Sequence, residues 1–134
     1  MDRYGRTMSN DFNNGTVGWT DWNILLDQNG GPNHVGNFCF APVHADTNSG
    51  ELIFTPAHYY IGHFSKFTRP NEKRVITVSN RSHLLSTSFI NQDGTMATVV
   101  MNQSDMEITY KVYVESQTVE VKIAPHAMQT LLIQ

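Results

Sequence analysis

Two tryptophans, an aspartate and an asparagine lie within the six residues of GWTDWN, residues 18–23, directly before an apolar run. The chain has only these two tryptophans. An indole ring can stack on the apolar C–H face of a sugar, while an acid and an amide bind its hydroxyl groups. One interpretation of Trp19, Asp21 and Trp22 is therefore that one ring packs and the other forms the platform of a carbohydrate site. A second interpretation stays open: two core tryptophans beside an aspartate that pairs with an arginine.

The acidic residues give no support for a catalytic pair in this chain. Glycosidic bond hydrolysis uses two carboxyl groups that face each other across the scissile bond. Three of the five glutamates fall on the polar register or the turns of a predicted sheet, and the other two lie in a loop and a junction (Glu107, Glu115 and Glu120; Glu51 and Glu72). Asp21 is the only acid inside an aromatic cluster, and it has no acidic neighbour. We therefore expect no catalytic residue here.

Metal and cofactor chemistry is equally unsupported by the sequence. His58 and His63 lie five residues apart, not the three or four that place two ligands on one helix face, and no carboxylate is near them. Cys39 lies between two phenylalanines, which is typical of a small buried hydrophobic residue. Phosphate-loop and dinucleotide fingerprints are missing. We expect neither a metal nor a cofactor.

Composition restricts the partners and the location. With a net charge of −3 and nine scattered lysines and arginines, the chain gives no electrostatic reason to bind nucleic acid. No apolar run approaches the roughly 20 residues that a transmembrane helix needs. The N-terminal sequence MDRYGRTMSNDF lacks the apolar stretch of a signal peptide. The compartment is therefore not predicted.

The elements that must position the site differ between the two halves of the chain. In the first half, residues 16–25 favour a strand, and a Gly/Asn/Pro loop follows over residues 27–37. A helix is predicted from Pro56 with Thr55 as its N-cap. Its apolar stripe is Ala57, Tyr60, Phe64 and Phe67. One βα unit cannot bury both of its faces, so we expect this stripe to be exposed and the first half to be the less stable one.

In the second half the apolar period changes from 3.6 to 2. Alternating residues over 108–115 and 119–123 predict two strands around a turn at residues 116–117. The turn NQDG joins a strand that ends at Ile90 to one over residues 96–100. With residues 74–78 and 128–133, about six short strands result, which is typical of an antiparallel β-sandwich.

Three motifs in order, GWTDWN, GGPN and GHFSKF, closely resemble the end of glycoside hydrolase family 30, the glucosylceramidase-like enzymes. NQDGTMATVVMNQ and PHAMQTLLIQ match more loosely. The resemblance implies retaining cleavage of β-glucosidic bonds by two glutamates, on a (β/α)8 barrel with a β-sandwich beside it. It also implies a mixed α and β fold dominated by β. Residues 1–69 would be the terminal βα unit of the barrel, and residues 70–134 the antiparallel sandwich domain.

The resemblance also implies roles for individual residues. Trp22 matches the tryptophan platform of the sugar subsite, Asn37 an asparagine in the loop that lines the same pocket, and Asp21 a supporting polar residue. Trp19 would pack against the helical layer. The two catalytic glutamates would lie on strands that precede Met1. Residues 4–12 would be the tail of the seventh helix, although YGRTMSNDF is a poor helix sequence.

Three functions remain open. The leading one is the C-terminal fragment of a retaining β-glucosidase of glucosylceramidase type, hence of sphingolipid metabolism, inactive by itself. Its partners would be a β-glucoside or glucosylceramide-like substrate and the missing N-terminal barrel portion, or a second copy. The second is a β-sandwich module that binds carbohydrate or glycolipid. The third is one half of a split or truncated enzyme with a structural role only.

Overall fold

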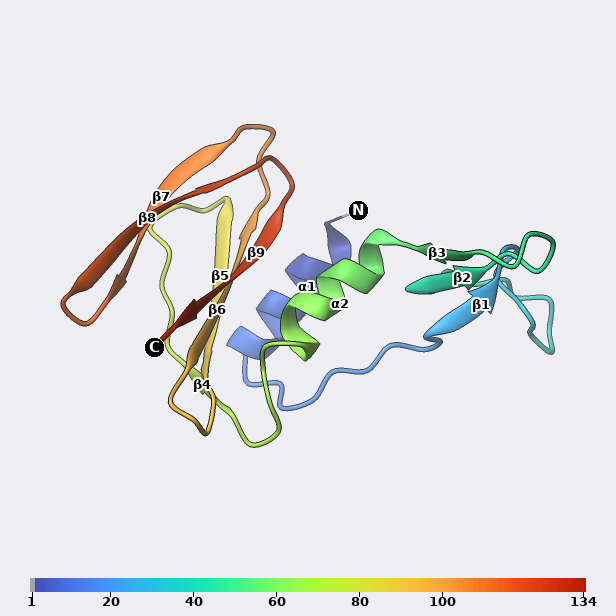
Figure 1. Ribbon diagram of the computed structural model, residues 1–134, viewed down its shortest axis with the longest axis horizontal. Helices are drawn as coiled ribbons and strands as arrows, with labels where there is room; N and C mark the ends of the chain where they lie inside the picture. The colour runs from blue at the N-terminus through green and yellow to red at the C-terminus, as the bar shows by residue number, and fades with distance from the viewer. Residues whose placement is uncertain (1) are drawn as a thin grey trace.

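The computed structural model describes residues 2–134. Two helices lie between a small three-stranded sheet and a larger β-sandwich, as Figure 1 shows. In chain order the elements are α1 (Arg3–Asn13), β1 (Leu25–Asp27), β2 (Val43–Ala45), β3 (Leu52–Phe54), α2 (Pro56–Ser65), β4 (Lys73–Val75), β5 (Leu84–Ile90), β6 (Met96–Asn102), β7 (Ile108–Val114), β8 (Gln117–Ile123) and β9 (Met128–Ile133).

The second half confirms the predicted antiparallel sandwich. One layer is a four-stranded sheet in the order β4-β5-β6-β9, and the other is the β7–β8 hairpin. The register pairs Ser88 with Thr98 between β5 and β6, and Tyr110 with Val121 in the hairpin. Alternation along β6 sends Val100 toward the hairpin and Val99 toward the helices.

The four-stranded sheet is covered on both faces. Between the sheet and the hairpin lies a hydrophobic cluster of Leu84, Val100, Ile108, Tyr110 and Ile123. A second cluster lies between the sheet and the helices (Met8, Phe64, Phe89 and Val99). This second cluster joins residues from both sides of the domain boundary that the sequence predicts at residues 69 and 70.

Helix α2 begins at Pro56 and has Thr55 as its N-cap residue, as predicted. The Thr55 hydroxyl makes no capping bond; it donates to the carbonyls of Ala41 and Pro42. The expectation of an exposed apolar stripe was wrong, because Tyr60 and Phe64 are buried at 8% and 2% exposure. Helix α1 and the sandwich sheet supply the surface that a lone βα unit lacks.

Residues 3–13 form a helix despite their poor propensity. Met8 and Ser9 are buried in it, and the Ser9 carbonyl accepts a hydrogen bond from Thr87 of β5. At Gly5 an added Cβ would lie 2.6 Å from the end of the Met128 side chain and 2.9 Å from the Tyr60 ring, so a larger residue would displace these side chains. Tertiary packing thus overrides the local preference.

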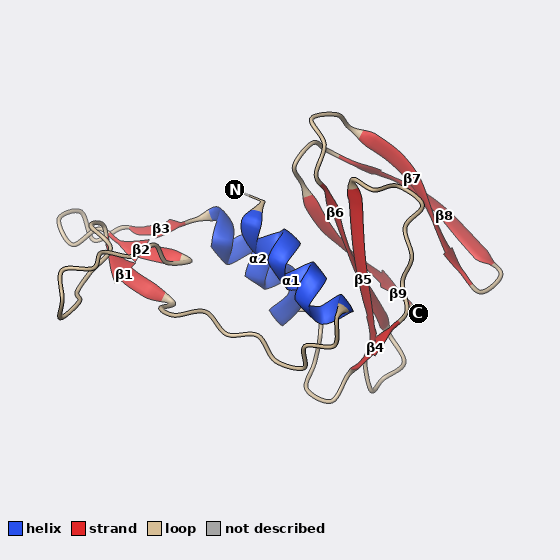
Figure 2. Ribbon diagram, turned by 180° about the vertical axis from the view of Figure 1, so that it is seen from behind, coloured by secondary structure: helices blue, strands red, loops and turns tan. Residues whose placement is uncertain are grey.

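The predicted strand over residues 16–25 was wrong for most of its length. Only Leu25–Asp27 forms a strand, parallel to β2, and Figure 2 draws the whole connection from α1 to β1 as loop. An extended segment becomes a strand only when a neighbour pairs with its backbone. Apart from one bond from the Val43 N–H to the Ile24 carbonyl, residues 16–24 pair with no other strand in the part of the chain that the structure describes.

Candidate functional site

Asp21 lies between the two tryptophans and joins the loop to helix α1. One of its carboxylate oxygens accepts a hydrogen bond from the Tyr4 hydroxyl at 2.8 Å. The other accepts one from the backbone N–H of Trp22 at 2.9 Å. Burial, followed by the bond to Asp21, raises the pKa of Tyr4 to about 12. Tyr4 therefore stays a neutral donor that fixes the carboxylate.

Trp22 and Trp19 have different surroundings. The Trp22 side chain is 84% exposed and packs on no core cluster. Trp19 is half-buried, lies edge-on to the Tyr4 ring at 5.9 Å between centroids, and packs against the cluster of Met8 and Phe64. The expected packing of Trp19 against the helical layer is confirmed, although strand alternation is not its cause.

Asn37 is exposed in the loop between β1 and β2, and its carbonyl oxygen lies 3.4 Å from the Cys39 sulfur. Cys39 is half-exposed, so the expectation of a buried cysteine was wrong. Within residues 2–134 no hydrogen bond joins Asn37 to Asp21 or Trp22. Asp21 and Trp22 are thus together because they are adjacent in the sequence, and Asn37 lies on a separate loop.

Tyr4 is the site residue that sequence reasoning missed. It lies 17 positions before Asp21 and on an element with poor helix propensity, so no local pattern links the two. His44 was missed as well: its ring contacts the backbone at both ends of the loop that carries Asn37. In the sequence, only the position of His44 shortly after the Gly/Asn/Pro loop could have pointed to its contact with that loop.

Within residues 2–134, four acidic side chains other than Asp21 pair with a histidine or a lysine. No group of three His, Cys, Asp or Glu side chains could hold a metal ion there. Asp2 and Asp105 flank His126, with contacts of 2.7 and 2.8 Å, so they form an ion-pair cluster with a histidine. Glu120 and Glu107 pair with Lys111 and Lys122 on the hairpin. Each of these four acids therefore has a histidine or a lysine as its partner.

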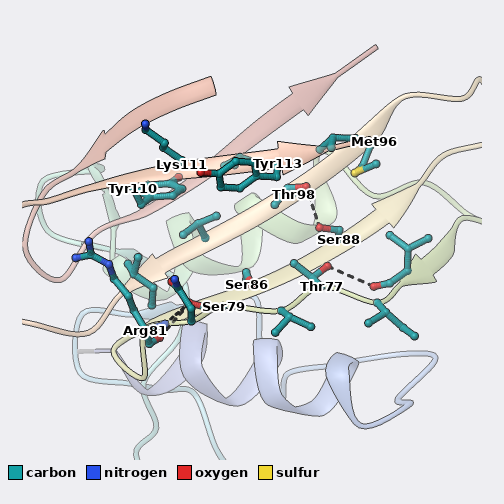
Figure 3. A pocket seen from close by; sticks show the side chains of 18 of the residues that line it. Thr77, Ser79, Arg81, Ser86, Ser88, Met96, Thr98, Tyr110, Lys111 and Tyr113 are labelled. Carbon is teal, nitrogen blue, oxygen red and sulfur yellow. Dashed lines mark hydrogen bonds between the residues drawn. The ribbon is translucent and has the colours of Figure 1, made fainter. Parts of the chain in front are cut away.

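A cavity of about 870 Å³ lies between the two layers of the sandwich. Its walls are β7, the segment of residues 75–81, and the faces of β5 and β6. Figure 3 shows hydroxyl groups and two tyrosine rings, Tyr110 and Tyr113, around it, with Ser88 and Thr98 joined by a hydrogen bond of 2.8 Å. The lining is thus mixed: aliphatic side chains such as Ile76, Leu84 and Val100 lie beside the hydroxyl groups and the two rings. Rings and hydroxyl groups can contact a sugar.

Comparison with known families decides the identity. The family model described as the glycosyl hydrolase family 30 TIM-barrel domain matches residues 1–68, and the family 30 beta sandwich domain matches residues 73–131. The chain belongs to glycoside hydrolase family 30. The barrel part followed by a sandwich, with a β-dominated fold, agrees with the fold that the sequence predicts.

Relatives of this family 30 chain carry glucosylceramidase names. It is 39% identical to the mouse lysosomal acid glucosylceramidase over 93 residues, which is 69% of this chain and 18% of that protein. It is 30% identical to the putative glucosylceramidase 3 of Caenorhabditis elegans over 98% of this chain and 26% of the relative. The chain therefore spans about a quarter or less of these two relatives.

Solved structures show the same arrangement. SrfJ from Salmonella typhimurium superposes with a TM-score of 0.96 at 33% identity, covering 98% of this chain and 30% of that one. The endo-beta1,6-glucanase BT3312 gives a TM-score of 0.72 at 26% identity, over 81% of this chain and 25% of that one. No helix within residues 2–134 is long and apolar enough to cross a membrane.

Proposed function

We propose that residues 1–134 are the C-terminal portion of a retaining β-glucosidase of glucosylceramidase type. In this proposal Trp22 is the platform of the sugar subsite, Asp21 supports it, and Asn37 lines the same pocket from the neighbouring loop. The sandwich stabilises this wall of the barrel. The two catalytic glutamates come from outside these residues.

One observation carries the proposal: Trp22 is 84% exposed while the adjacent acid is held by Tyr4. A large apolar ring that remains in water next to a fixed carboxylate has the composition of a stacking platform. Because Trp19 packs and Trp22 does not, the two-core-tryptophan interpretation no longer accounts for both rings.

The exposed apolar surface of the first half supports the need for a larger barrel. Phe54 of β3 and Tyr59 of α2 are 48% and 61% exposed, and other large apolar side chains around β1 to β3 are similarly open (Ile24, Leu25, Phe38, Phe40, Leu52 and Ile53). Open apolar surface of this kind marks a contact with another protein segment. The remaining barrel portion is the proposed occupant.

The substrate class rests on the relatives. Their printed names are glucosylceramidases, so we propose a β-glucoside with a lipid aglycone of the glucosylceramide type. The exposed loop with His34 next to the proposed sugar site would meet the aglycone.

The test measures release of a chromophore from an aryl β-glucoside. The 134-residue chain alone should be inactive, because a retaining site needs two carboxyl groups about 5 Å apart. The N-terminal portion of a family 30 glucosylceramidase, fused to or mixed with this chain, should restore turnover. Trp22→Ala in the assembled protein should then lower kcat/KM. Turnover by the chain alone, or an assembled protein indifferent to Trp22→Ala, would contradict the proposal.

The sandwich cavity favours a second candidate, a carbohydrate-binding or glycolipid-binding module. Its volume of about 870 Å³ and the tyrosine rings and hydroxyl groups among its aliphatic lining suit a sugar. The two functions differ in the residues that bind. Saturable glucoside binding by the isolated chain that Tyr113→Ala abolishes and Trp22→Ala leaves intact would favour the module.

A further inference from the structure

The loop between β1 and β2 is fastened at its start by Asp27. One carboxylate oxygen of Asp27 accepts hydrogen bonds from the backbone N–H groups of Asn29 at 2.8 Å and Gly31 at 2.9 Å. The backbone N–H of Asp27 also donates to the Gly31 carbonyl at 2.6 Å. Three bonds therefore fix the first turn of the loop.

A backbone bond closes the loop in its middle. The N–H of Cys39 donates to the Gly30 carbonyl at 2.9 Å, so residues 31–38 form a closed segment with Asn37 in it. Gly30 has φ of +88°, and a Cβ added there would lie 2.3 Å from the Cys39 carbonyl oxygen. Only glycine allows the two strands of the loop to approach this closely.

His44 of β2 contacts both ends of this loop. Its Nε2 accepts the N–H of Ala41 at 3.1 Å, and its Nδ1 lies 2.7 Å from the Asp27 carbonyl oxygen. Because a backbone N–H can only donate, Nε2 must be unprotonated, and the ring proton must lie on Nδ1, which donates to Asp27. One neutral ring thus joins the start of the loop to its end.

We propose that His44, with Asp27, is a positioning residue that holds the β1–β2 loop in the conformation that presents Asn37 to the sugar. This inference rests on the proposed function, in which Asn37 lines the subsite. The side chain of Asn37 forms no hydrogen bond within residues 2–134, so its place depends on the backbone that carries it. A Gly/Asn/Pro loop of this length would otherwise sample many conformations.

Cys39 provides a built-in reporter of the loop. It is the only cysteine in the chain, so the rate of reaction with a thiol reagent reports this position alone. His44→Phe keeps a ring and removes both bonds, whereas His44→Gln keeps an acceptor for the Ala41 N–H. Labelling of His44→Phe should be faster by roughly five- to tenfold, with His44→Gln in between. The exposed His83 gives the matched control, since His83→Phe should label like the unaltered chain.

Two further measurements separate local from global effects. Amide exchange at Val99 in the buried sheet should be equal in His44→Phe and the unaltered chain, because only the loop opens. Nitrogen-15 NMR of the His44 ring should show the Nδ1–H tautomer. Equal Cys39 labelling in all variants, or a ring protonated at Nε2 alone, would overturn the inference.

Kinetics of the assembled enzyme test the link to the sugar. His44→Phe should raise KM as Asn37→Ala does, with a smaller change in kcat, and His44→Gln should recover part of the loss. The double variant should be no worse than Asn37→Ala alone. An active assembled enzyme with unchanged KM in His44→Phe would overturn the positioning role. An inactive assembled enzyme would instead overturn the proposed function and leave the labelling result to decide on His44.

Discussion

At the scale of single residues, the two tryptophans divide between structure and surface. Trp19 lies against Tyr4 and the helix cluster, whereas Trp22 leaves its ring in solvent. Asp21 lies between them in the sequence, and its carboxylate accepts a hydrogen bond from the Tyr4 hydroxyl. The carboxylate is therefore part of the scaffold that orients the loop, and in the proposed function it also serves the sugar subsite.

Trp19→Ala should mainly reduce stability, whereas Trp22→Ala should mainly reduce catalytic efficiency. Removing the half-buried Trp19 ring should lower the free energy of unfolding by about 2–3 kcal/mol, because its packing is lost. Removing the exposed Trp22 ring should change stability by less than about 0.5 kcal/mol and lower kcat/KM in the assembled enzyme. Thermal midpoints and kinetics measured side by side test both. Equal stability losses with unchanged kinetics would contradict the platform role of Trp22.

At the scale of elements, the two helices pack as a layer on one face of the four-stranded sheet. Phe64 of α2 touches the rings of Phe12 of α1 and Phe89 of β5, with centroid distances of 5.2 and 6.4 Å. The stripe on α2 that the sequence identifies therefore has a partner inside the chain. This contact crosses the predicted domain boundary, so the helices and the sandwich support each other.

Phe64→Ala should destabilise the whole chain. Phe64 is 2% exposed in the cluster that joins both halves, so its truncation should cost about 3–5 kcal/mol of unfolding free energy. Tyr59→Ala on the same helix is the control, because Tyr59 is 61% exposed and should cost less than about 0.5 kcal/mol. Urea unfolding monitored by circular dichroism measures both. Similar costs for the two variants would show that α2 is not packed on the sheet.

Amide exchange should follow packing and not the two halves of the chain. Helix α2 should exchange slowly together with β5 and β6, because its buried face opens only with the sheet. Residues 16–24 should exchange quickly, since no strand pairs with them in the described structure. Exchange mass spectrometry of the monomer resolves these segments. Fast exchange throughout α2 would restore the expectation of an unstable first half.

At the scale of the whole molecule, His126 joins distant parts of the chain. Its Nδ1 contacts Asp2 next to α1 at 2.7 Å, and its Nε2 contacts Asp105 in the β6–β7 loop at 2.8 Å. The Tyr60 hydroxyl of α2 also contacts Asp2, at 3.3 Å. Hydrogen bonds to Asp105, then to Asp2, raise the pKa of His126 above its ordinary value.

The sign of the pH dependence follows from that direction. A raised folded-state pKa means that protonated His126 stabilises the fold below the ordinary histidine pKa, and this contribution is lost as pH rises through the folded pKa. His126→Asn should therefore lower the melting temperature most at mildly acidic pH, with the difference shrinking toward alkaline pH. Asparagine suits the left-handed φ of +52° at this position. Melting curves across pH measure this difference, with His83→Asn as the control. A melting-temperature difference that does not change with pH would contradict the stabilising role of protonated His126.

The sequence alone determined the features that depend on local period and local chemistry. The alternation over residues 108–115 defines the hairpin strands, because a strand with one buried face must alternate. Pro56 and the spacing of Tyr60 and Phe64 define α2 and its apolar face, although not that this face is buried. The motifs GWTDWN, GGPN and GHFSKF were enough to identify the family. The resemblance that these motifs carry also supplies Trp22, Asp21 and Asn37 as candidate site residues.

Only the tertiary structure decided what depends on residues distant in the chain. Helix α1 forms in a sequence of poor propensity because Gly5 and Met8 pack on the sheet. Residues 16–24 are not a strand because no neighbour pairs with them. Tyr4 bonds to Asp21, and His44 bonds to Asp27, each across 17 positions in the sequence. His44 also bonds to Ala41 across a turn. Such contacts arise from the spatial approach of separate elements, and a periodic pattern carries no information about them.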